Sequence, residues 1–417
     1  MILADRETEM KSGKVHSKII GIFISSLIMA VAGCDKDPTG PEPEVPTRGE
    51  IVSSNSIAVL TPQAIEIILS AWVDPLPVEL TYTVNAIKIV YWTVDNNGNF
   101  VEASGALYIP VGASDPPVLS LHHGTVTARD EVASEGPMGS LEGIIGLFTA
   151  SGTGYLTCIP DYLGYGESDM LHPYIHANSS STAVIDFLRA SRAYCVNNDI
   201  APGAELFLGG YSEGGYVTLA TQRDMELNYS DEFDITAVAP MAGPYDLAST
   251  VEIVIQYTTY EWPAYIAFLF LAYDNIYGWE RLDEVINPDY AGMLPVLFDG
   301  NHSLHTINGE LPNDISLLLN GDFVTDYLGG NEPEIQTAFE ENTLLDWAPI
   351  APIRFYHGDA DVTVPYQNSV TAYDSLTANG AVSIELVMVP GGTHETTAPL
   401  VMLDALDWFE SFRITLF

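Results

Sequence analysis

Apolar runs and segments with a helical hydrophobic pattern alternate along most of the chain. Short continuous apolar runs, such as VLSLHHG and DITAVAPMAG, are typical of strands that are covered on both faces. Helical patterns lie between such runs at residues 139–150 and 180–194, and another begins at Gly214. Because strands alternate with helices, the sequence predicts the α/β fold class, with a mostly parallel central sheet flanked by helices.

The two ends of this region complete the predicted sheet. A short helix is expected at residues 61–72, and the strand-like runs AIKIVYWTV and FVEASGALYIPV flank the turn residues DNNGN. That arrangement is typical of a β-hairpin. The main domain is expected to span residues 51–417. Two more predicted strands near the C-terminus, each paired with a helix, are APIRFYHG and VSIELVMVP.

The alternation of strands and helices stops between about residues 245 and 347. This stretch is rich in aromatic residues and predicts a helical cap over the carboxyl edge of the sheet, where open α/β sheets bind ligands. Its aromatic side chains either line an apolar ligand pocket or pack within the cap. Those singled out are Trp262, Tyr265, Phe268, Phe270 and Trp279.

The first residues have the layout of a secretory signal. A basic stretch precedes an apolar run from Ile19, and the run ends in small residues before Cys34. Residues 1–33 are therefore predicted to be a signal peptide. The acidic leader MILADRETE does not fit a signal, so Met10 is an alternative start.

The segment Val31-Ala32-Gly33-Cys34 resembles the end of a bacterial lipoprotein signal, in which the cysteine becomes the lipidated first residue. The resemblance implies a membrane anchor on Cys34 and a place in the bacterial cell envelope, at the outer membrane or cell surface. A plain transmembrane anchor or an uncleaved signal is the alternative, although the apolar run is short for a membrane span. Residues 34–50, rich in Pro and acid, are expected to form a flexible tether.

Composition narrows the classes of partner. The chain has 14 Lys and Arg against 56 Asp and Glu, giving a formal net charge of −42. This balance excludes nucleic acid as a partner, because nucleic-acid binding needs clustered basic side chains. Two cysteines remain besides Cys34, and an extracytoplasmic location permits a disulfide between Cys158 and Cys195, which the sequence leaves open. The oligomeric state is also left open.

The sequence Gly210-Tyr211-Ser212-Glu213-Gly214 follows a predicted strand and precedes a predicted helix. In that setting G-x-S-x-G forms a nucleophile elbow, a tight turn that presents the serine at the end of the sheet. Small residues two positions before and after the serine allow the turn to close. Ser212 is therefore the candidate nucleophile, at a helix N-terminus whose dipole favours developing negative charge.

A serine nucleophile needs a base, and the base needs an orienting carboxylate. In this kind of fold the chain order is Ser, then Asp or Glu, then His. Asp361 and His394 follow the last two predicted strands and fit that order, but Asp359 is an equally placed neighbour. The segment HGDADVTVP resembles the H-G-x-x-D-x-x-V-P motif of α/β-hydrolases, and the resemblance assigns the carboxylate to Asp361.

Two backbone N–H groups are expected to bind the oxyanion. One is the N–H of Glu213, directly after the nucleophile. The other, by resemblance to the HG-x loops of α/β-hydrolases, is that of Thr125. The segment IPDYLGYGES resembles the D-x-x-G-x-G-x-S loop of the same superfamily, which implies a structural role for Asp161. No histidine spacing matches a metal site, so no metal is expected, and the resemblance to α/β-hydrolases implies that no other cofactor is needed.

From about Tyr82 to the C-terminus the chain resembles an α/β-hydrolase, and is most similar to bacterial relatives of the secretory lipases. The resemblance rests on the ordered motifs ASGALYIP, HGT, DYLGYGES and YSEGG, followed by the two C-terminal motifs. It implies a serine carboxylic ester hydrolase that acts on a small-molecule or lipid ester. Two alternatives stay open: a serine peptidase of the prolyl-oligopeptidase or aminopeptidase type, and a surface binding protein without enzymatic activity.

Overall fold

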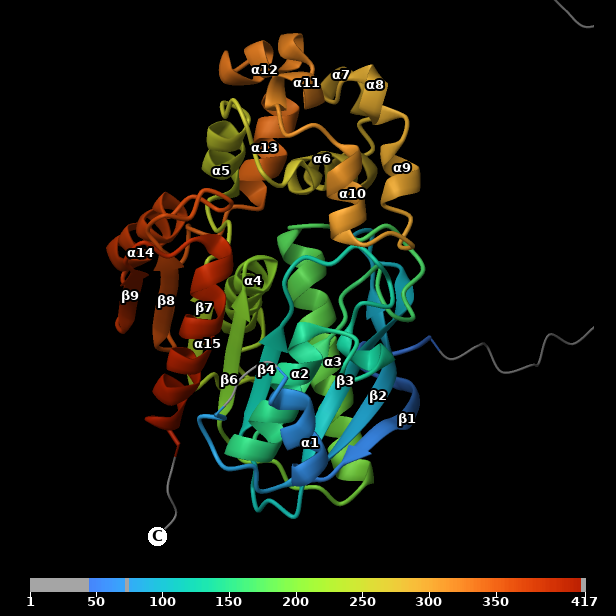
Figure 1. Ribbon diagram of the computed structural model, residues 1–417, viewed down its shortest axis with the longest axis vertical. Coiled ribbons are helices and arrows are strands. Elements are labelled where there is room, and N and C mark those ends of the chain that lie inside the picture. The colour runs from blue at the N-terminus through green and yellow to red at the C-terminus, as the bar shows by residue number, and fades with distance from the viewer. Residues whose placement is uncertain (1–44, 72–74, 414–417) are drawn as a thin grey trace, which may run out of the picture. The chain divides into compact units, whose positions relative to one another are not determined.

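The computed structural model describes residues 45–71 and 75–413, and the described residues from Pro46 onward form one compact unit. Nine strands within these residues form one sheet in the order β1-β2-β3-β5-β4-β6-β7-β8-β9 (Figure 1). The strands are β1 (Ile51–Leu60), β2 (Thr83–Val94), β3 (Phe100–Val111), β4 (Val118–His122), β5 (Leu156–Pro160), β6 (Leu206–Tyr211), β7 (Ala237–Met241), β8 (Ile353–Gly358) and β9 (Ile384–Val389).

The sheet is antiparallel on one side and parallel on the other. Strands β1, β2, β3 and β5 pair antiparallel, whereas β5, β4, β6, β7, β8 and β9 pair in parallel. The predicted hairpin forms between β2 and β3, with Asp95 accepting hydrogen bonds from the backbone N–H groups of Asn97 and Asn99. The predicted α/β class with a mostly parallel sheet is confirmed, and β1 is an additional strand that the pattern did not indicate.

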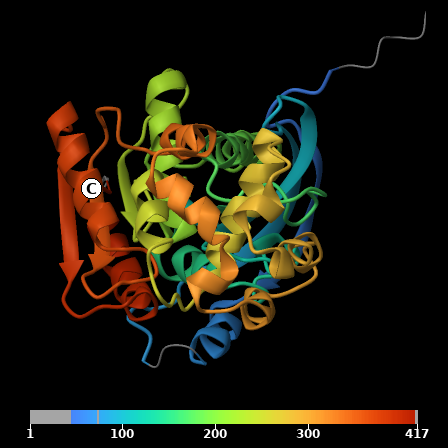
Figure 2. The same ribbon diagram turned by 90° about the horizontal axis from the view of Figure 1, so that it is seen from above.

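Helices cover both faces of the sheet. On one face, α3 and α4 pack against the central strands and α14 against β8 and β9, while α1, α2 and α15 cover the other face. Figure 2 shows these two layers from above, with the cap helices over the middle strands. The layer helices are α1 (Pro62–Leu69), α2 (Leu141–Phe148), α3 (Ala177–Asn197), α4 (Glu213–Asn228), α14 (Gln367–Asn379) and α15 (His394–Glu410); short turns lie at η1 (Ala133–Glu135) and η2 (Thr149–Thr153).

The helices between β7 and β8 form a cap above the carboxyl ends of the strands (Figure 1). Its central helix, α6, is buried along most of its length, and Phe270 contacts the rings of Phe323 and Phe339 at centroid distances of 5.4 and 5.8 Å. The cap helices are α5 (Leu247–Val254), α6 (Pro263–Tyr277), α7 (Leu282–Val285), α8 (Pro288–Ala291), α9 (Leu294–Leu297), α10 (Leu304–Glu310), α11 (Ile315–Leu318), α12 (Gly321–Leu328) and α13 (Pro333–Glu341).

The domain begins a few residues before the expected boundary at residue 51. Arg48 donates hydrogen bonds to the Asp186 carboxylate of α3, and the Gly49 N–H donates to the Trp92 carbonyl of β2. Residues 46–50 therefore belong to the packed unit rather than to the tether, because these contacts fix both side chain and backbone. The expected signal peptide (1–33), Cys34 and the rest of the expected tether up to residue 44 lie outside the described residues.

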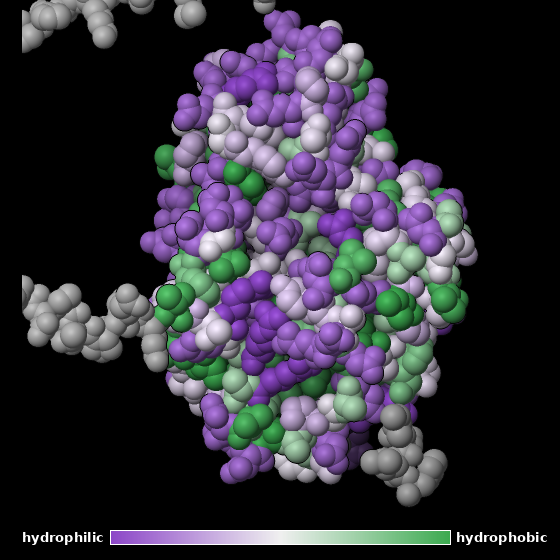
Figure 3. Space-filling model, turned by 180° about the vertical axis from the view of Figure 1, so that it is seen from behind, coloured by the Kyte–Doolittle hydropathy of each residue, from purple (hydrophilic) through white to green (hydrophobic). Residues whose placement is uncertain are grey.

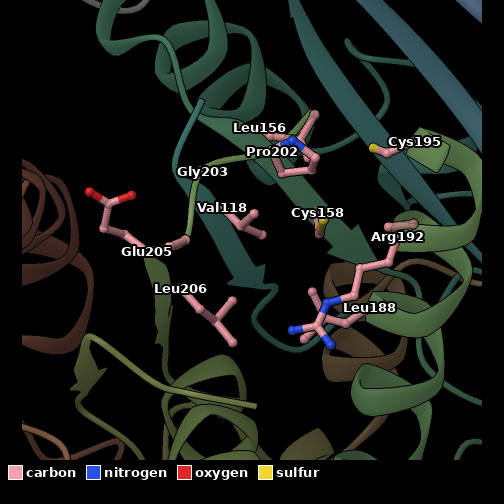
Figure 4. A pocket seen from close by; sticks show the side chains of 12 residues that line it. Val118, Leu156, Cys158, Leu188, Arg192, Cys195, Pro202, Gly203, Glu205 and Leu206 are labelled. Carbon is pink, nitrogen blue, oxygen red and sulfur yellow. The ribbon is translucent and has the colours of Figure 1, made fainter. Parts of the chain in front are cut away.

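The amino ends of β4, β5 and β6 border a cavity of about 240 Å³ (Figure 4). Ser212 follows the carboxyl end of β6, so the cavity lies at the opposite end of these strands. Cys158 and Cys195 line this cavity as free, buried thiols. Burial raises the pKa of Cys158 to about 12 and that of Cys195 to about 11, so both thiols stay protonated near neutral pH. The structure shows no disulfide between these two described cysteines, a pairing that the sequence left open.

Polar residues cover most of the face shown in Figure 3, including the cap, and apolar residues form only small separate groups there. This surface agrees with the excess of acidic over basic residues in the chain. In the part of the chain that the structure describes, no helix combines the length and apolar character needed to cross a bilayer.

Candidate active site

The nucleophile elbow forms where β6 passes directly into α4. Ser212 joins the two elements with φ +59° and ψ −123°, a positive-φ conformation that side-chain-bearing residues rarely adopt. A side chain at Gly210 or Gly214 would collide with backbone carbonyls, those of Gly214 and His122 respectively. The glycines therefore permit a turn that lifts Ser212 out of the sheet edge, as the motif predicts.

Ser212, His394 and Asp361 lie in one hydrogen-bonded chain. Ser212 Oγ is 2.9 Å from His394 Nε2, and His394 Nδ1 is 2.6 Å from Asp361 Oδ2. Because a carboxylate only accepts hydrogen bonds, His394 Nδ1 carries the proton and the Nε2 lone pair faces the serine hydroxyl. The structure thus brings together the three residues that the sequence singled out, in the tautomer that a general base requires.

His394 is the first residue of α15, and the neighbouring strand helps to hold it. The Tyr211 hydroxyl donates a 2.6 Å hydrogen bond to the His394 carbonyl, and the two rings lie 5.1 Å apart. Thr393 caps the helix with its side chain. The residue just before Ser212 therefore also fixes the position of the base, a link between the two motifs that the sequence did not show.

Asp361 lies in the loop after β8 and is held as a carboxylate. It accepts 2.9 Å hydrogen bonds from the Thr363 and Val364 N–H groups and further bonds from His357 and His394. Burial alone would raise the pKa of Asp361, but the hydrogen bonds and charges of the two histidines lower it to about 2. Asp361 is therefore ionised throughout the neutral range.

Asp359 takes no part in this chain. It is exposed, and its Oδ1 accepts a 2.6 Å hydrogen bond from the Gly391 N–H. Of the two neighbouring aspartates, Asp361 is therefore the one that is hydrogen-bonded to His394, as the motif indicated.

His357 is a contact of Asp361 to which the sequence gave no role. Its Nε2 lies 2.9 Å from the Val364 carbonyl and 3.1 Å from Asp361 Oδ2, so Nε2 carries the proton. Its Nδ1 lies 2.7 Å from Ser369 Oγ and accepts a hydrogen bond from that hydroxyl. His357 is the first residue of the HGDADVTVP motif, so the signal was present in the segment that identified Asp361.

The loop after β4 brings Thr125 to the same edge as Ser212. The preceding Gly124 lies against Ser212, and its N–H donates to Glu142 Oε1 at 3.2 Å. Because Gly124 is engaged in this way, the next N–H along the loop, that of Thr125, is the better candidate for a substrate oxygen. The Thr125 hydroxyl is itself 3.0 Å from the Tyr174 hydroxyl. Glu213 begins α4, and a first-turn N–H has no acceptor within its own helix.

The Glu213 side chain turns inward and meets a histidine from a distant loop. Glu213 Oε1 lies 2.7 Å from His172 Nε2, and both side chains are buried. The second oxygen, Oε2, is buried without a hydrogen-bond partner. Sequence reasoning assigned Glu213 a backbone role only and left His172 without one.

Asp161 and His122 are buried in separate networks. The Ser104 hydroxyl donates to Asp161 Oδ2 at 2.6 Å, in agreement with the structural role expected for this aspartate. His122 lies between Ser120 Oγ and Thr218 Oγ1, and burial lowers its pKa to about 3, so it stays neutral. Among the described residues, no group of three or more His, Cys, Asp or Glu is arranged to hold a metal ion.

A small apolar pocket lies in front of Ser212. Its volume is about 50 Å³, and both the cap and the core line it. Tyr265 of α6 is one of the lining residues, whereas the cap aromatics Phe268 and Phe270 are buried in packing contacts with other rings. Trp262 and Trp279 also stack on neighbouring tyrosines. Of the five aromatic candidates, only Tyr265 lines this pocket.

Comparisons with known proteins find similarity to lipases and esterases. A family model described as secretory lipase matches residues 323–413, which include Asp361 and His394. No curated protein gives a significant match.

Solved structures resemble the chain over most of its length. A protein described as a putative hydrolase from Legionella pneumophila is 26% identical with a TM-score of 0.82, over 88% of this chain and 99% of its own. The rice cell wall degrading esterase LipA from Xanthomonas oryzae is 26% identical with a TM-score of 0.76, over 88% of this chain and 100% of its own. Candida antarctica lipase A in its closed state shares the fold. It is 18% identical with a TM-score of 0.67, over 88% of this chain and 82% of its own. The chain therefore has the α/β-hydrolase fold, and the comparisons support an ester-hydrolysing enzyme of the lipase and esterase type.

Proposed function

We propose that this chain is a serine carboxylic ester hydrolase with Ser212 as nucleophile, His394 as general base and Asp361 as the orienting carboxylate. The observation that carries the proposal is the hydrogen-bonded chain from Ser212 Oγ through His394 to Asp361, with distances of 2.9 and 2.6 Å. This chain lies at a strained elbow and opens onto an apolar pocket. Those are the elements that acyl transfer through a serine requires.

In the proposed reaction, Ser212 Oγ attacks the acyl carbonyl carbon while its proton passes to His394 Nε2. The electron pair of the carbonyl moves onto its oxygen, and the Glu213 and Thr125 N–H groups bind the resulting oxyanion. Collapse of the intermediate breaks the bond to the alcohol, which leaves with the proton from His394. Water then attacks the acyl-enzyme by the same steps, so that a carboxylic acid leaves and Ser212 is restored.

Asp361 supports both halves of this cycle without exchanging a proton itself. Its carboxylate holds Nδ1–H of His394, which keeps Nε2 free to accept the serine proton. When His394 becomes positively charged, the adjacent negative charge of Asp361 stabilises it. The low pKa of Asp361, about 2, ensures that this charge is present at neutral pH.

The proposed substrate is a small-molecule or lipid ester, and the cap is expected to move for it to enter. The pocket in front of Ser212 has a volume of about 50 Å³. At about 30 Å³ per water, this space holds one or two water molecules and no acyl chain of appreciable length. Tyr265 of the cap and Val364 of the core both line this space. Separation of the cap from the core would therefore widen the acyl site.

A lipid anchor on Cys34 is the second part of the proposal. The support is the layout of the N-terminus, with an apolar run that ends in Val31-Ala32-Gly33-Cys34, and the match to a family of secreted lipases. Mass analysis of the membrane-associated protein tests it. A diacylated N-terminal peptide that begins at Cys34 is expected in the native chain, and a Cys34→Ala chain is expected to lose it. An unmodified Cys34 would contradict the anchor.

The catalytic proposal is tested with Ser212→Ala and p-nitrophenyl esters from acetate to palmitate. The rate is expected to fall by about a thousandfold or more, because only transition-state binding remains without the nucleophile. Ser114→Ala is the matched control, since Ser114 is exposed in the loop before β4. Retained ester turnover in Ser212→Ala would refute the mechanism. Cleavage of a proline-terminated peptide anilide, without cleavage of the esters, would favour a peptidase instead.

A further inference from the structure

A second histidine–carboxylate pair lies directly behind the nucleophile elbow. His172 is in the loop between β5 and α3, and Glu213 follows Ser212 in the chain. Their side chains are 3% and 0% exposed, and Nε2 and Oε1 lie 2.7 Å apart. The backbone N–H of the same glutamate is a proposed oxyanion donor. A buried carboxylate at this position needs a physical explanation, because its negative charge would oppose that of the oxyanion.

The hydrogen bonds of His172 fix how many protons the pair holds. His172 Nδ1 lies 2.7 Å from the Leu163 carbonyl, which can only accept, so Nδ1 carries a proton. One further proton must lie between Nε2 and Glu213 Oε1, since two lone pairs at 2.7 Å would repel each other. The pair is therefore a neutral acid beside a neutral imidazole, or a carboxylate beside an imidazolium. Its net charge is zero in both arrangements.

The second oxygen of Glu213 distinguishes these two arrangements. Glu213 Oε2 is buried and has no hydrogen-bond partner. Leaving an ionised oxygen buried and unpartnered costs more than leaving the carbonyl oxygen of a neutral acid in the same state. The geometry therefore favours the neutral acid, with its proton on Oε1 donated to His172 Nε2.

Other titratable side chains surround the pair. The imidazole of His123 stacks on Tyr162, but its two nitrogens contact the Gly124 and Asp161 carbonyls rather than Glu213. Tyr162 and Tyr165 follow β5, Tyr174 precedes α3, and Tyr265 comes from α6, and burial raises the pKa of each of these tyrosines. These hydroxyls therefore stay protonated. The carboxylate of α2 in this region, Glu142, accepts the Gly124 N–H. Every Lys or Arg within the described residues that forms an ion pair does so with a carboxylate other than Glu213.

We propose that His172 is a positioning residue for the proposed ester hydrolysis: it holds the proton shared with Glu213, and so keeps the residue that supplies an oxyanion N–H uncharged. The inference rests on the proposed function. Without His172, Glu213 loses the partner that makes the shared proton hard to remove. Its carboxyl would then ionise as the pH rises, and a negative charge next to the oxyanion would slow the acylation step.

The test is the pH dependence of kcat for His172→Phe with p-nitrophenyl butyrate, read at a pH-independent wavelength. Phenylalanine preserves the packing of the ring against Tyr165 and Phe268, at centroid distances of 4.6 and 5.8 Å, and removes both nitrogens. A new alkaline decline is expected, with kcat falling about tenfold or more between about pH 7 and pH 9 relative to the native chain. The double variant His172→Phe/Glu213→Gln is expected to lose this decline, because glutamine stays neutral at every pH.

The matched control is His176→Phe, which removes a partly buried histidine near the end of the same connection. His176 contacts Ser179 and Tyr277 but not Glu213. Its kcat profile is expected to keep the shape of the native one. A uniform loss of kcat in His172→Phe with the native pH profile would show a purely structural role and overturn the proposal. So would an alkaline decline that persists in the double variant. Failure of the proposed function is recognised separately, because the native chain would then cleave no ester or Ser212→Ala would retain ester turnover.

Discussion

Two buried carboxylates meet histidines on either side of Ser212, and their environments are opposite. Asp361 accepts two backbone N–H groups and contacts two histidines, whereas Glu213 contacts only His172 and has an oxygen with no partner. The first environment is built to hold a negative charge, which the pKa of about 2 for Asp361 reflects. The second offers the carboxyl group one histidine and no backbone donor, and there we propose a shared proton. The number of donors around a carboxylate, rather than its residue type, thus determines what it contributes beside a nucleophile.

The two pairs also differ in how they reach the elbow. Asp361 lies in the loop after β8, and His394 is the first residue of α15. Both are at the carboxyl edge of the sheet. His172 comes from the long connection between β5 and α3, and it contacts the first residue of α4. The first pair is oriented toward the serine hydroxyl and the second toward the residue that follows it. Their proposed tasks are accordingly proton transfer and preservation of the oxyanion site.

The largest expected effect that separates the two pairs is that of Asp361→Asn. Asparagine cannot hold Nδ1–H of His394 as a carboxylate does, so kcat is expected to fall on the order of ten-thousandfold. Glu213→Gln removes a carboxyl from the other pair and is expected to cost less than about tenfold, because glutamine remains neutral and can donate to His172. Steady-state kcat for both variants measures the contrast. Equal losses would contradict the different roles given to the two carboxylates.

A smaller loss is expected for His357→Phe, which removes one donor from Asp361 and leaves the direct bond to His394 in place. A hydrogen bond to a charged group contributes about 1.5–3 kcal/mol, so kcat/KM is expected to fall about ten- to a hundredfold. The pH–rate profile should also shift, because the pKa of Asp361 would rise without this donor. An unchanged kcat/KM would remove His357 from the account of how Asp361 is held.

The charge on Asp361 also predicts an acid-dependent term in stability. Its pKa is lowered from 3.8 to about 2 on folding, so this contribution is present above pH 3.8 and disappears as the pH falls toward 2. Its size is about 2 kcal/mol at neutral pH. The free energy of unfolding in urea should fall between pH 3.8 and pH 2 for both proteins. The fall should be larger for the native chain than for Asp361→Asn, by about 2 kcal/mol. Parallel pH dependences for the two proteins would be inconsistent with the lowered pKa.

The smallest expected effect is that of Tyr211→Phe, which deletes the 2.6 Å hydrogen bond to the His394 carbonyl while preserving the ring. The loss of one neutral hydrogen bond costs about 1 kcal/mol of unfolding free energy, and kcat is expected to fall only a few-fold. Thermal and chemical unfolding, measured beside kcat, check both values. A loss of kcat as large as that of Asp361→Asn would mean that Tyr211 acts in the chemistry and not only in holding α15.

Much of this architecture could be predicted from the sequence because local signals and global fold agree. The G-x-S-x-G motif stands between a strand and a helix, and its glycines are required by the backbone itself at Ser212. Asp361 and His394 follow strands in the order that the fold dictates. The α/β alternation therefore placed both loops at the carboxyl edge, and the motif around His357 selected Asp361 over Asp359.

Other features depend on contacts that no local pattern encodes. The pairing of His172 with Glu213 spans 41 positions and depends on how an irregular loop folds. Strand β1 is largely exposed and carries serines and an asparagine among its apolar residues, so it has no buried-strand pattern. The cap was expected to be helical, but the bounds of its short helices could not be predicted. Their N-cap residues are Asn, Ser or Asp, which are equally common in loops; these helices are α8, α10, α11 and α12.

The central claim, that Ser212 is acylated with His394 as its base, is tested most directly by labelling with a fluorophosphonate and mapping the modified peptide. A single adduct on Ser212 is predicted in the native chain. Its rate of formation should fall about a thousandfold in His394→Ala, because the hydroxyl then loses the base that lies 2.9 Å away. An adduct on another residue, or labelling of Ser212 at the native rate without His394, would contradict the account.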